Sequence, residues 1–592
     1  MKMLAKTLTA LVGMAASGMI ALAGDVKVGW LEIGGELHER PSELAWLMGS
    51  EENPTLRQVV DTIEEAGGSD KLSGLVIRLK DAQLTPTQVQ EIGKAIRHAR
   101  DAGKKVHVFG EGFDTSDFLL GSYADEVICQ SGGAVSLPGM YMEEMFLADT
   151  LAWAGLKADF VQVGDYKGAS EQMARNGPSK QWNQNIDQLL DSLYANVRTE
   201  LKQGRRLDDA KLDAAMEALW MADAADAVKA GLIDKEVDMP LIVKHLANAY
   251  KGEIKIERES AGEAGELSAD MANPFAMMGA LSKSPSNKTK GPTIAVLHID
   301  GAIVDGDSVG GFGGGGEVGS RTIRNALEDI LADGNIKGMI VRIDSPGGSA
   351  TASEVIWQGV RRVAAAKPVW TSVGGMAASG GYYIAVAGDK VYVNPSSIVG
   401  SIGVVGGKVS LQGLYEKFHV NVVGRGRGPK AAMFGSNTTW SAEDAASVRQ
   451  KMTSTYGLFT KRVAAGRKGI DLDKTAEGRL FTGDKAIDLH MADVIGGLDD
   501  ALNDMADKLN LDTFAVMDYP APRPIGEVLQ DMLKGLGGLP GLHAPISGEV
   551  FNAVKEVVGE RVWRQLESPM KAMMQMREGK VMLVSPRVLI FK

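Results

Sequence analysis

The chain has 592 residues, of which 44% are hydrophobic, and this length is enough for two or more domains with cores of their own. Its formal net charge of -11 argues against a nucleic-acid-binding protein, which would carry a basic patch. Cys129 is the sole cysteine, so an intramolecular disulfide and a cysteine-based metal cluster are both excluded.

The first 24 residues have the pattern of a targeting segment. Lys2 and Lys6 precede an apolar, small-residue stretch at 8–23, which closes in Ala21-Leu22-Ala23. A basic start, an apolar middle and such an end are typical of a secretory signal peptide, and an uncleaved anchor in the inner membrane is the alternative. Both place the folded part outside the cytoplasm, so we expect an exported, periplasmic protein whose membrane association would run through this N-terminus.

The sequence contains the same domain twice. Residues 74–79 (GLVIRL) match residues 338–343 (GMIVRI), which lie 264 positions later. Two further matches follow in the same order at offsets of 261 to 264, and they pair 124–128 with 388–392 and 220–225 with 481–486. Three ordered matches at nearly one offset indicate a tandem duplication.

The duplication divides the chain into five parts. A segment rich in Glu, Ser, Lys and Gly separates the two copies, and a series of proline turns follows the second copy. The tail has helical patterns and a final apolar strand at 581–584, without a counterpart in the first copy, so it is predicted to cap the fold or to mediate oligomerisation. The predicted parts are the targeting segment 1–24, the first repeat 25–255, the linker 256–292, the second repeat 293–518 and the C-terminal helical extension 519–592.

Each copy alternates short apolar strands with helical patterns, and this predicts right-handed βαβ crossovers and an α/β fold. In the second copy the predicted strands are 294–299, 339–343, 369–372 and 391–393, and the predicted helices are 322–331, 353–366 and 382–387.

A serine between small residues is the first candidate for chemistry. Ser379 lies in Gly374–Tyr383 (GGMAASGGYY), directly after the apolar run 368–373 and before a predicted helix. Small neighbours would let a substrate backbone approach the hydroxyl, and a helix N-terminus offers free N–H groups to a developing negative charge. The alternative is a serine that only caps the helix. This stretch alone leaves both interpretations open.

A glycine pair follows the strand that precedes this turn in the chain. Residues 344–349 read DSPGGS, and they should lie at the carboxyl edge of a buried strand, where open α/β sheets place their sites. The amides of Gly347 and Gly348 suit an oxyanion hole or an extended peptide bound by strand addition. The alternative is a simple Pro-Gly turn. The first copy has no glycine at the equivalent 80–84, which favours a functional reason for the pair.

The first copy has also lost the serine turn. Ser116 falls opposite Ser379, but Asp117 and Phe118 replace the two glycines that follow Ser379. A carboxylate beside a forming oxyanion would oppose the reaction, so the first copy is not expected to hold a nucleophile.

A serine nucleophile needs a base. None of the eight histidines lies in a glycine-rich turn, so a Ser-His-Asp triad has no support in the sequence. Lysine can serve instead, provided that burial lowers its pKa.

Three segments together resemble the signal peptide peptidase A family in its long, two-domain form. They are the DSPGGS loop at 344–349, the turn MAASGGY at 376–382 and GSIG at 400–403, and the resemblance covers roughly residues 25–515. It implies a fold similar to the crotonase and Clp-protease group, present twice here, and a Ser/Lys dyad with Ser379 as nucleophile. Gly348 and Gly380 would donate to the oxyanion, with Gly347 beside them.

The resemblance also suggests which lysine is the base. In the long form it comes from the N-terminal copy in a Gly-x-Tyr-Lys segment, which matches Gly164-Asp165-Tyr166-Lys167. Single-domain members take their lysine from the region of Lys430, which is the rival. Lys167 is favoured by the fit of its segment, and because a supporting role would explain why the degenerate first copy is kept.

The implied function is serine endopeptidase activity on remnant signal peptides and other extended apolar peptides, without metal or cofactor. The family implies a homo-oligomer, namely a tetramer. Two alternatives on the same fold stay open: an acyl-CoA enzyme, which export disfavours because CoA is cytoplasmic, and a catalytically silent scaffold.

Overall fold

The computed structural model describes residues 25–40, 54–259, 261, 291–308, 316–521 and 582–584, the last three as backbone only. The predicted targeting segment 1–24, most of the predicted linker and the predicted tail helices lie outside the described residues. Within the described part, no helix combines the length and hydropathy needed to span a membrane. The same part holds no cluster of three metal-ligating side chains.

The first repeat is built on a six-stranded parallel sheet in the order β8-β4-β3-β2-β1-β9. Its strands are β1 (Val26–Glu36), β2 (Gly74–Gln83), β3 (Lys105–Gly110), β4 (Glu126–Cys129), β8 (Lys235–Glu236) and β9 (Ile254–Glu259). Its main helices are α2 (Leu56–Gly68), α3 (Pro86–Asp101), α4 (Thr115–Gly121), α7 (Lys180–Arg205), α8 (Asp209–Ala218), α9 (Ala224–Lys229) and α10 (Ile242–Tyr250).

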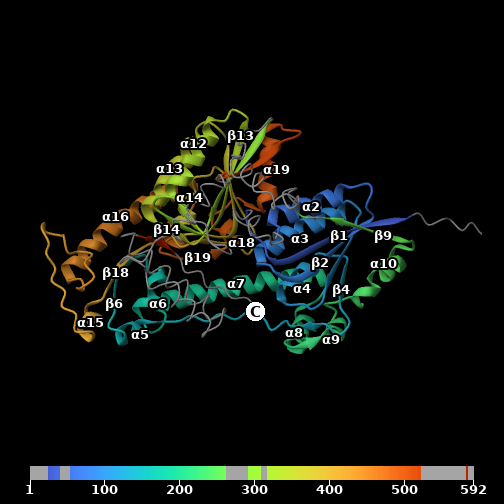
Figure 1. Ribbon diagram of the computed structural model, residues 1–592, viewed down its shortest axis with the longest axis horizontal. Helices are drawn as coiled ribbons and strands as arrows, with labels where there is room; N and C mark the ends of the chain where they lie inside the picture. Colours follow the sequence, from blue (N-terminus) through green and yellow to red (C-terminus); the bar gives the residue numbers. More distant parts are fainter. Residues whose placement is uncertain are drawn as a thin grey trace, which may run out of the picture.

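The second repeat reproduces this order as β20-β16-β15-β13-β10-β21. Its strands are β10 (Thr293–Asp300), β13 (Ile336–Ser345), β15 (Val369–Ala378), β16 (Val391–Val393), β20 (Val494–Ile495) and β21 (Ala515–Tyr519), and β17 (Ile398–Gly400) and β19 (Leu480–Thr482) extend the sheet beside β15. Its helices are α12 (Ser320–Ala332), α13 (Ala350–Ala364), α14 (Gly380–Ala385), α15 (Gln412–Lys417), α16 (Ala442–Gly466), α17 (Leu472–Thr475), α18 (Gly483–Asp488) and α19 (Leu498–Leu509). Because the strand order repeats, the duplication inferred from the sequence is a duplication of fold (Figure 1).

Two boundaries in the structure differ from those predicted from the sequence. Strand β9 runs to Glu259 and is the counterpart of β21, so the first repeat reaches into the segment predicted as linker from residue 256. The strand before Ser379 is also longer than predicted. It continues through Ala378, because Met376, Ala377 and Ala378 pair with β17.

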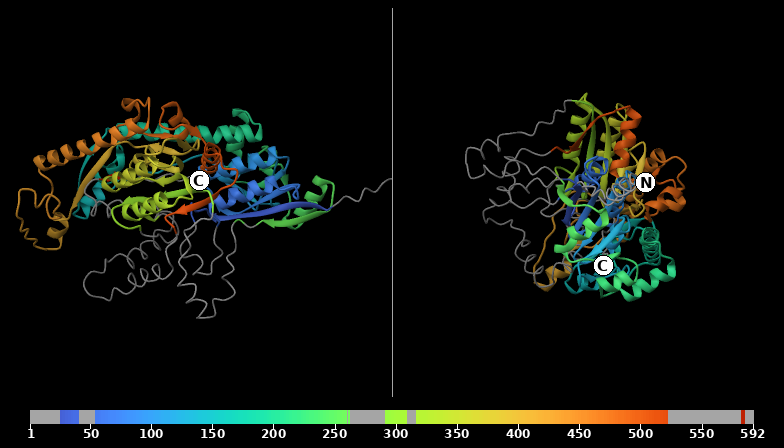
Figure 2. Two further views of the ribbon diagram at one scale, coloured as in Figure 1. Left: turned by 90° about the horizontal axis from the view of Figure 1, so that it is seen from above. Right: turned by 90° about the vertical axis from the view of Figure 1, so that its right-hand side faces the viewer.

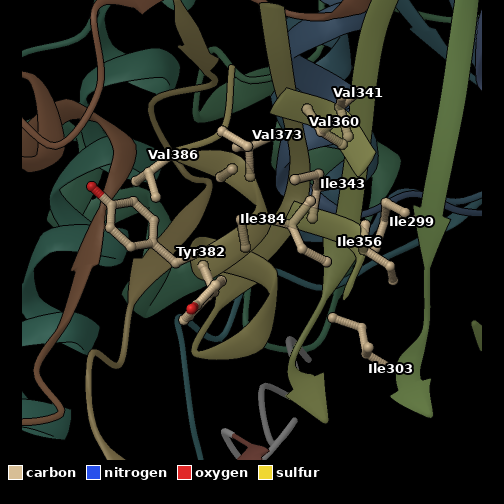
Figure 3. Packing of buried hydrophobic residues seen from close by; sticks show 14 of the residues in the cluster. Ile299, Ile303, Val341, Ile343, Ile356, Val360, Val373, Tyr382, Ile384 and Val386 are labelled. Atoms are coloured by element: carbon tan, nitrogen blue, oxygen red, sulfur yellow. The ribbon is translucent and has the colours of Figure 1, made fainter. Parts of the chain in front are cut away.

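The core of the second repeat lies between its sheet and the helices α12, α13 and α14. Strands β10 and β13 are buried along nearly their whole length, as expected of parallel strands covered on both faces. Side chains such as Val341, Ile343, Ile356 and Ile384 meet there (Figure 3). Ser379 therefore stands at the start of a helix that is packed against a rigid core.

A third sheet joins the repeats, in the order β12-β11-β14-β22-β18-β6. Strand β6 (Lys157–Val163) of the first repeat pairs antiparallel with β18 (Val404–Ser410) of the second, from Val163 opposite Val404 to Lys157 opposite Ser410. The other strands are β11 (Ala302–Val304), β12 (Glu317–Gly319), β14 (Gly347–Ser349) and the C-terminal β22 (Met582–Val584). Short elements complete the fold, namely β5 (Ala134–Val135), β7 (Ala222–Asp223), α5 (Ala148–Trp153) and α6 (Glu171–Ala174).

Helix α7 crosses from the first repeat to the second and lies along both in an elongated molecule (Figures 1 and 2). Its buried residues Trp182, Ile186, Leu189 and Leu193 pack on Met376, Ala378, Ile398 and Leu480 of the second repeat. Asn185 in the same helix exchanges two hydrogen bonds with the backbone of Leu480. The first repeat thus supports the strands that flank Ser379.

Candidate active site

Ser379 occupies the sharp change of direction between β15 and α14. Its backbone has φ 55° and ψ -111°, in a region that non-glycine residues rarely adopt and that costs on the order of 1–3 kcal/mol. The amide of Ser379 donates to the carbonyl of Gly400 at 2.8 Å, which helps to hold this conformation. The side chain makes no capping hydrogen bond with α14, so the capping role left open by the sequence is not adopted.

Lys167 reaches this serine from the other repeat. Its Nζ lies 2.6 Å from Ser379 Oγ, although 212 residues separate the two in the chain. Lys167 follows the end of β6, and the pairing of β6 with β18 brings the segment after β6 to the start of β18. The contact is formed within a single chain.

Two glycines make room for the lysine. A Cβ on Gly403 would lie 3.1 Å from Lys167 Cδ, and a Cβ on Gly478 would lie 2.5 Å from the Lys167 amide nitrogen. Gly478 also has φ +91°, which a side chain would strain. The backbone around Lys167 is therefore packed so closely that the lysine has little freedom to move.

Burial lowers the pKa of Lys167 well below its usual range. The side chain is 1% exposed, and desolvation penalises the charged ammonium form. The hydrogen bonds of Nζ go to serine oxygens and not to a carboxylate. These partners therefore carry no full negative charge that would stabilise the ammonium form and raise the pKa again.

Ser401 is a site residue that sequence reasoning missed. Lys167 Nζ lies 2.9 Å from the Ser401 carbonyl oxygen and 2.9 Å from Ser401 Oγ. Ser401 is buried with φ 52°, a second left-handed non-glycine residue beside Ser379. The GSIG segment that contains it contributed to the family resemblance, and this was the available signal, but no local pattern links Ser401 to Lys167.

The glycine loop lies directly beside the serine turn. A Cβ on Gly380 would lie 3.1 Å from the Gly348 amide nitrogen and 3.2 Å from Gly347 Cα, so the two glycine segments face each other. A Cβ on Gly348 would meet the carbonyl oxygen of Ile303 at 1.9 Å, which excludes a side chain there. Gly347 has φ +98°, and its amide donates to Ser345 Oγ at 3.1 Å. Close packing at Gly348 and Gly380 and the positive φ of Gly347 therefore each favour glycine, apart from any catalytic role.

The rival lysine lies elsewhere. Lys430 is exposed, and its Nζ bonds Asp444 at 3.1 Å and Ser447 at 3.4 Å. The structure therefore brings together Ser379, Lys167 and the glycine segments, and it does not bring Lys430 to them.

The degenerate first-repeat turn has a different chemistry. Ser116 Oγ donates to Asp114 at 2.7 Å, so its hydroxyl faces a carboxylate and not an amine. Asp117 accepts a hydrogen bond from the Asp114 amide at 3.0 Å, and burial, assisted by Asp114, raises the pKa of Asp117 to about 8. This turn is a capped helix start, as expected from the loss of its glycines.

Family comparison gives a consistent assignment for both repeats. The model of "Peptidase family S49" matches residues 98–252 and 361–512, which together are just over half of the chain. The model of "Clp protease" matches residues 319–399, which include the glycine loop and Ser379.

Relatives of known name are similar over most of the chain. "Protease 4" of Haemophilus influenzae is 29% identical over 518 residues, covering 82% of this chain and 80% of its own. "Protease 4" of Salmonella typhi is 27% identical over 488 residues, covering 81% and 76%. "Serine protease SPPA, chloroplastic" of Arabidopsis thaliana is 24% identical over 496 residues, covering 82% and 70%.

Among solved structures, a variant of the 1510-N membrane-bound stomatin-specific protease in complex with a substrate peptide is 16% identical. The match covers 42% of this chain and all of that chain, with a TM-score of 0.26.

Proposed function

The chain belongs to peptidase family S49 and is a serine peptidase, and on that premise we propose that Ser379 is its nucleophile and Lys167 its general base. The observation that carries this proposal is the 2.6 Å contact between Lys167 Nζ and Ser379 Oγ inside the protein. A buried amine beside a strained serine is the arrangement that activates a hydroxyl without histidine.

The hydrogen bonds of Lys167 fit a neutral amine. A neutral amine has two N–H donors and one lone pair. If the two N–H groups are given to the carbonyl and the Oγ of Ser401, the lone pair is left for the Ser379 hydroxyl. The Ser379 O–H then donates to Nζ, which is the direction that general-base catalysis needs.

The reaction proceeds through an acyl-enzyme. Ser379 Oγ attacks the scissile carbonyl carbon while its proton passes to Lys167 Nζ, and the C–O bond forms as the carbonyl becomes an oxyanion. Lys167 then gives the proton to the departing amine, the C–N bond breaks and the acyl group remains on Ser379. Lys167 next takes a proton from water, whose oxygen attacks the ester carbon. The bond between that carbon and Ser379 Oγ then breaks, Lys167 returns the proton to Oγ, and the acid is released.

Backbone amides stabilise the oxyanion in this proposal. The amides of Gly348 and Gly380 are the donors, with Gly347 shaping the loop beside them. The support is the proximity of the two glycine segments, since neither tolerates a Cβ without a shift of its neighbours. One such donor contributes on the order of 3–4 kcal/mol to the transition state.

The substrates proposed are extended apolar peptides, including remnants of signal peptides. Glycine-rich edges bind peptides mainly through backbone hydrogen bonds, so selectivity among side chains should be broad. A relative from Enterococcus faecium carries the name "Putative signal peptide peptidase SppA". Export through residues 1–24, periplasmic localisation, membrane association and a tetrameric assembly belong to the same proposal and stay predictions.

Three variants test the dyad on a fluorogenic peptide. We expect Ser379→Ala and Lys167→Ala each to lose activity by a factor of about 10³ or more, since dyad members act as a unit. Lys430→Ala is the matched control and should keep full activity. Full activity of Lys167→Ala would contradict a mechanism that uses both repeats. Full activity of Ser379→Ala would contradict the assignment of the nucleophile. An acyl-CoA enzyme of the same fold would not need Lys167 on Ser379.

A further inference from the structure

A short turn of the second repeat holds the segment that carries Lys167. The turn consists of residues 477–479 (EGR), directly before β19. The Tyr166 amide donates to the main-chain carbonyl of Glu477 at 2.8 Å, and the Asp165 amide donates to Glu477 Oε2 at 3.2 Å. Glu477 therefore accepts the two consecutive backbone amides that precede the lysine, one through its main chain and one through its side chain.

The backbone and the side chain of Glu477 are both fixed. Its φ is 61°, a left-handed conformation that residues with a Cβ seldom adopt. The Tyr456 hydroxyl of α16 donates to Glu477 Oε1 at 2.7 Å and accepts from the Glu477 amide at 3.3 Å. The opposite oxygen, Oε2, is thereby directed at the segment before Lys167. A Cβ on Gly164 would lie 2.8 Å from the Glu477 carbonyl carbon, so the two segments are in close contact.

The same turn also holds the residue that receives the other hydrogen bonds of Lys167. The Ser401 amide donates to the Arg479 carbonyl at 2.6 Å, and the Gly478 amide donates to the Ile402 carbonyl at 2.9 Å. Ser401 is the residue that Nζ contacts at its carbonyl oxygen and at Oγ. Three consecutive residues thus fix the backbone that carries the amine and the backbone that meets it.

We propose that Glu477 is a positioning residue for catalysis, which sets the place of Lys167 relative to Ser379 by holding the backbone of residues 165 and 166. The inference rests on the proposed dyad, because Lys167 is assigned as the base there. Glu477 acts only through the lysine segment, since the hydrogen bonds of Nζ go to serine oxygens and not to this carboxylate. A turn that merely joined the repeats would affect stability and leave kcat of the folded protein unchanged.

Two substitutions of Glu477 separate its hydrogen bonds from its charge. Glu477→Ala removes both carboxylate oxygens and leaves only the main-chain bond to Tyr166. We expect kcat to fall about ten- to a hundredfold with KM unchanged, since a small displacement of a base has effects of this size. Glu477→Gln also removes the charge, but it keeps an acceptor for the Asp165 amide and a polar group for Tyr456. Its kcat should stay within about threefold of the wild-type value.

The pH profile gives a readout that a merely structural role would not move. In Glu477→Ala a looser segment lets water reach Nζ, which weakens the desolvation that lowers the pKa of Lys167. The acid limb of kcat should therefore move to higher pH in this variant and stay in place in Glu477→Gln. Loss of a nearby negative charge alone would move the limb in the opposite direction, because an anion favours the ammonium form.

Two further variants complete the test. Lys251→Ala is the matched control, because it places alanine at nearly the same φ, 55°, at the exposed end of α10, and it should keep the wild-type kcat and acid limb. Tyr456→Phe keeps Glu477 and removes the hydroxyl that fixes its side chain, so kcat should fall about three- to tenfold. A wild-type kcat and acid limb in folded Glu477→Ala, or equal losses in Glu477→Ala and Glu477→Gln, would overturn the inference. If Glu477→Ala does not fold, a wild-type kcat in Tyr456→Phe would do so.

Hydrogen exchange separates this inference from the proposed dyad. Exchange of the amides of residues 164–168 is followed by mass spectrometry, and it should become about fivefold faster in Glu477→Ala but not in Glu477→Gln. If Lys167→Ala is inactive while Glu477→Ala has wild-type exchange and kcat, the positioning role fails and the dyad remains. If Lys167→Ala is fully active while exchange in Glu477→Ala is faster, Glu477 holds the segment but the dyad fails, and its positioning role in catalysis fails with it.

Discussion

Lys167 contacts Ser401 twice, at 2.9 Å through the carbonyl oxygen and at 2.9 Å through Oγ. With Lys167 as the proposed neutral base, Ser401 accepts both of its N–H groups and leaves the lone pair for Ser379. In this proposal Ser401 acts through the lysine and is a positioning residue.

Ser401→Ala should lower kcat by about ten- to a hundredfold, because misorientation of a base by a fraction of an ångström has effects of this size. KM should stay the same, since Ser401 is not proposed to touch substrate. Steady-state kinetics separate the two constants. A rise in KM of about ten- to a hundredfold with unchanged kcat would instead assign Ser401 to substrate binding.

The pH profile should report the amine of Lys167. Burial lowers its pKa, and the neutral form is the proposed base, so kcat should fall as the pH drops through the folded-state pKa and reach a plateau above it. The rate of acylation is measured from about pH 5 to 10 in buffers of constant ionic strength. A rate that is flat across the whole range would contradict Lys167 as a base.

The same burial predicts that Lys167→Met stabilises the protein while abolishing activity. Between the lowered folded-state pKa and the usual value of 10.5, the unfolded chain binds the proton and the folded chain does not. Stability of the wild type therefore rises with pH in this window. Lys167→Met should raise the free energy of unfolding by about 0.5–2 kcal/mol near neutral pH, and this increase should shrink toward pH 10.5. Chemical denaturation at several pH values measures it, and a gain that grows with pH would contradict this account.

Gly348→Ala should reduce kcat about a hundredfold or more, because the methyl group cannot fit and β14 must shift. The matched control is Gly334→Ala, since a Cβ on Gly334 meets nothing within 4 Å. Activity and thermal midpoint are measured for both. Wild-type activity in Gly348→Ala would remove this loop from the oxyanion site.

A buried ion cluster connects the repeats at another point. Arg342 of β13 donates to Glu91 of α3 at 2.8 Å and to Glu39 at 2.8 Å, and all three side chains are nearly inaccessible. Burial alone would raise the pKa of Glu39, but the charge and the hydrogen bonds of Arg342, with a smaller contribution from His298, together outweigh it and the pKa is lowered.

Arg342→Met should destabilise the protein by about 3–5 kcal/mol, because it leaves buried carboxylates unpaired. The difference in free energy of unfolding between the variant and the wild type should shrink as the pH falls. Protonation removes the unpaired charge of Glu39 in the variant, whereas it weakens the ion pair in the wild type. Arg362→Met is the control, because the Arg362–Glu328 pair is half exposed and should contribute below about 1 kcal/mol. Equal losses in both variants would argue against a role for the cluster in docking the repeats.

The sequence predicted the parts of the site that depend on local patterns. Ser379 and the glycine loop follow buried strands of the second repeat, and a strand-then-turn pattern is visible in a window of a few residues. Lys167 has no such pattern, and it was identified only through the family resemblance. Its contact with Ser379 depends on the antiparallel pairing of β6 with β18, and a pairing between distant strands leaves no trace in either strand alone.

Ser401 and β22 were beyond prediction for related reasons. The role of Ser401 depends on a lysine more than two hundred residues away. The strand at 581–584 was predicted, but its partners β14 and β18 were not, because an apolar strand can pair with any open edge.

The pairing of β6 with β18 also determines when the site can form during synthesis of the chain. The ribosome completes β6 long before it reaches Ser379, so a nascent chain carries the proposed base without the nucleophile. The pair meets only when both halves have folded and docked, so with the proposed dyad a partly synthesised chain has no working catalyst. Such a chain therefore cannot cleave its own unfolded segments before its fold is complete.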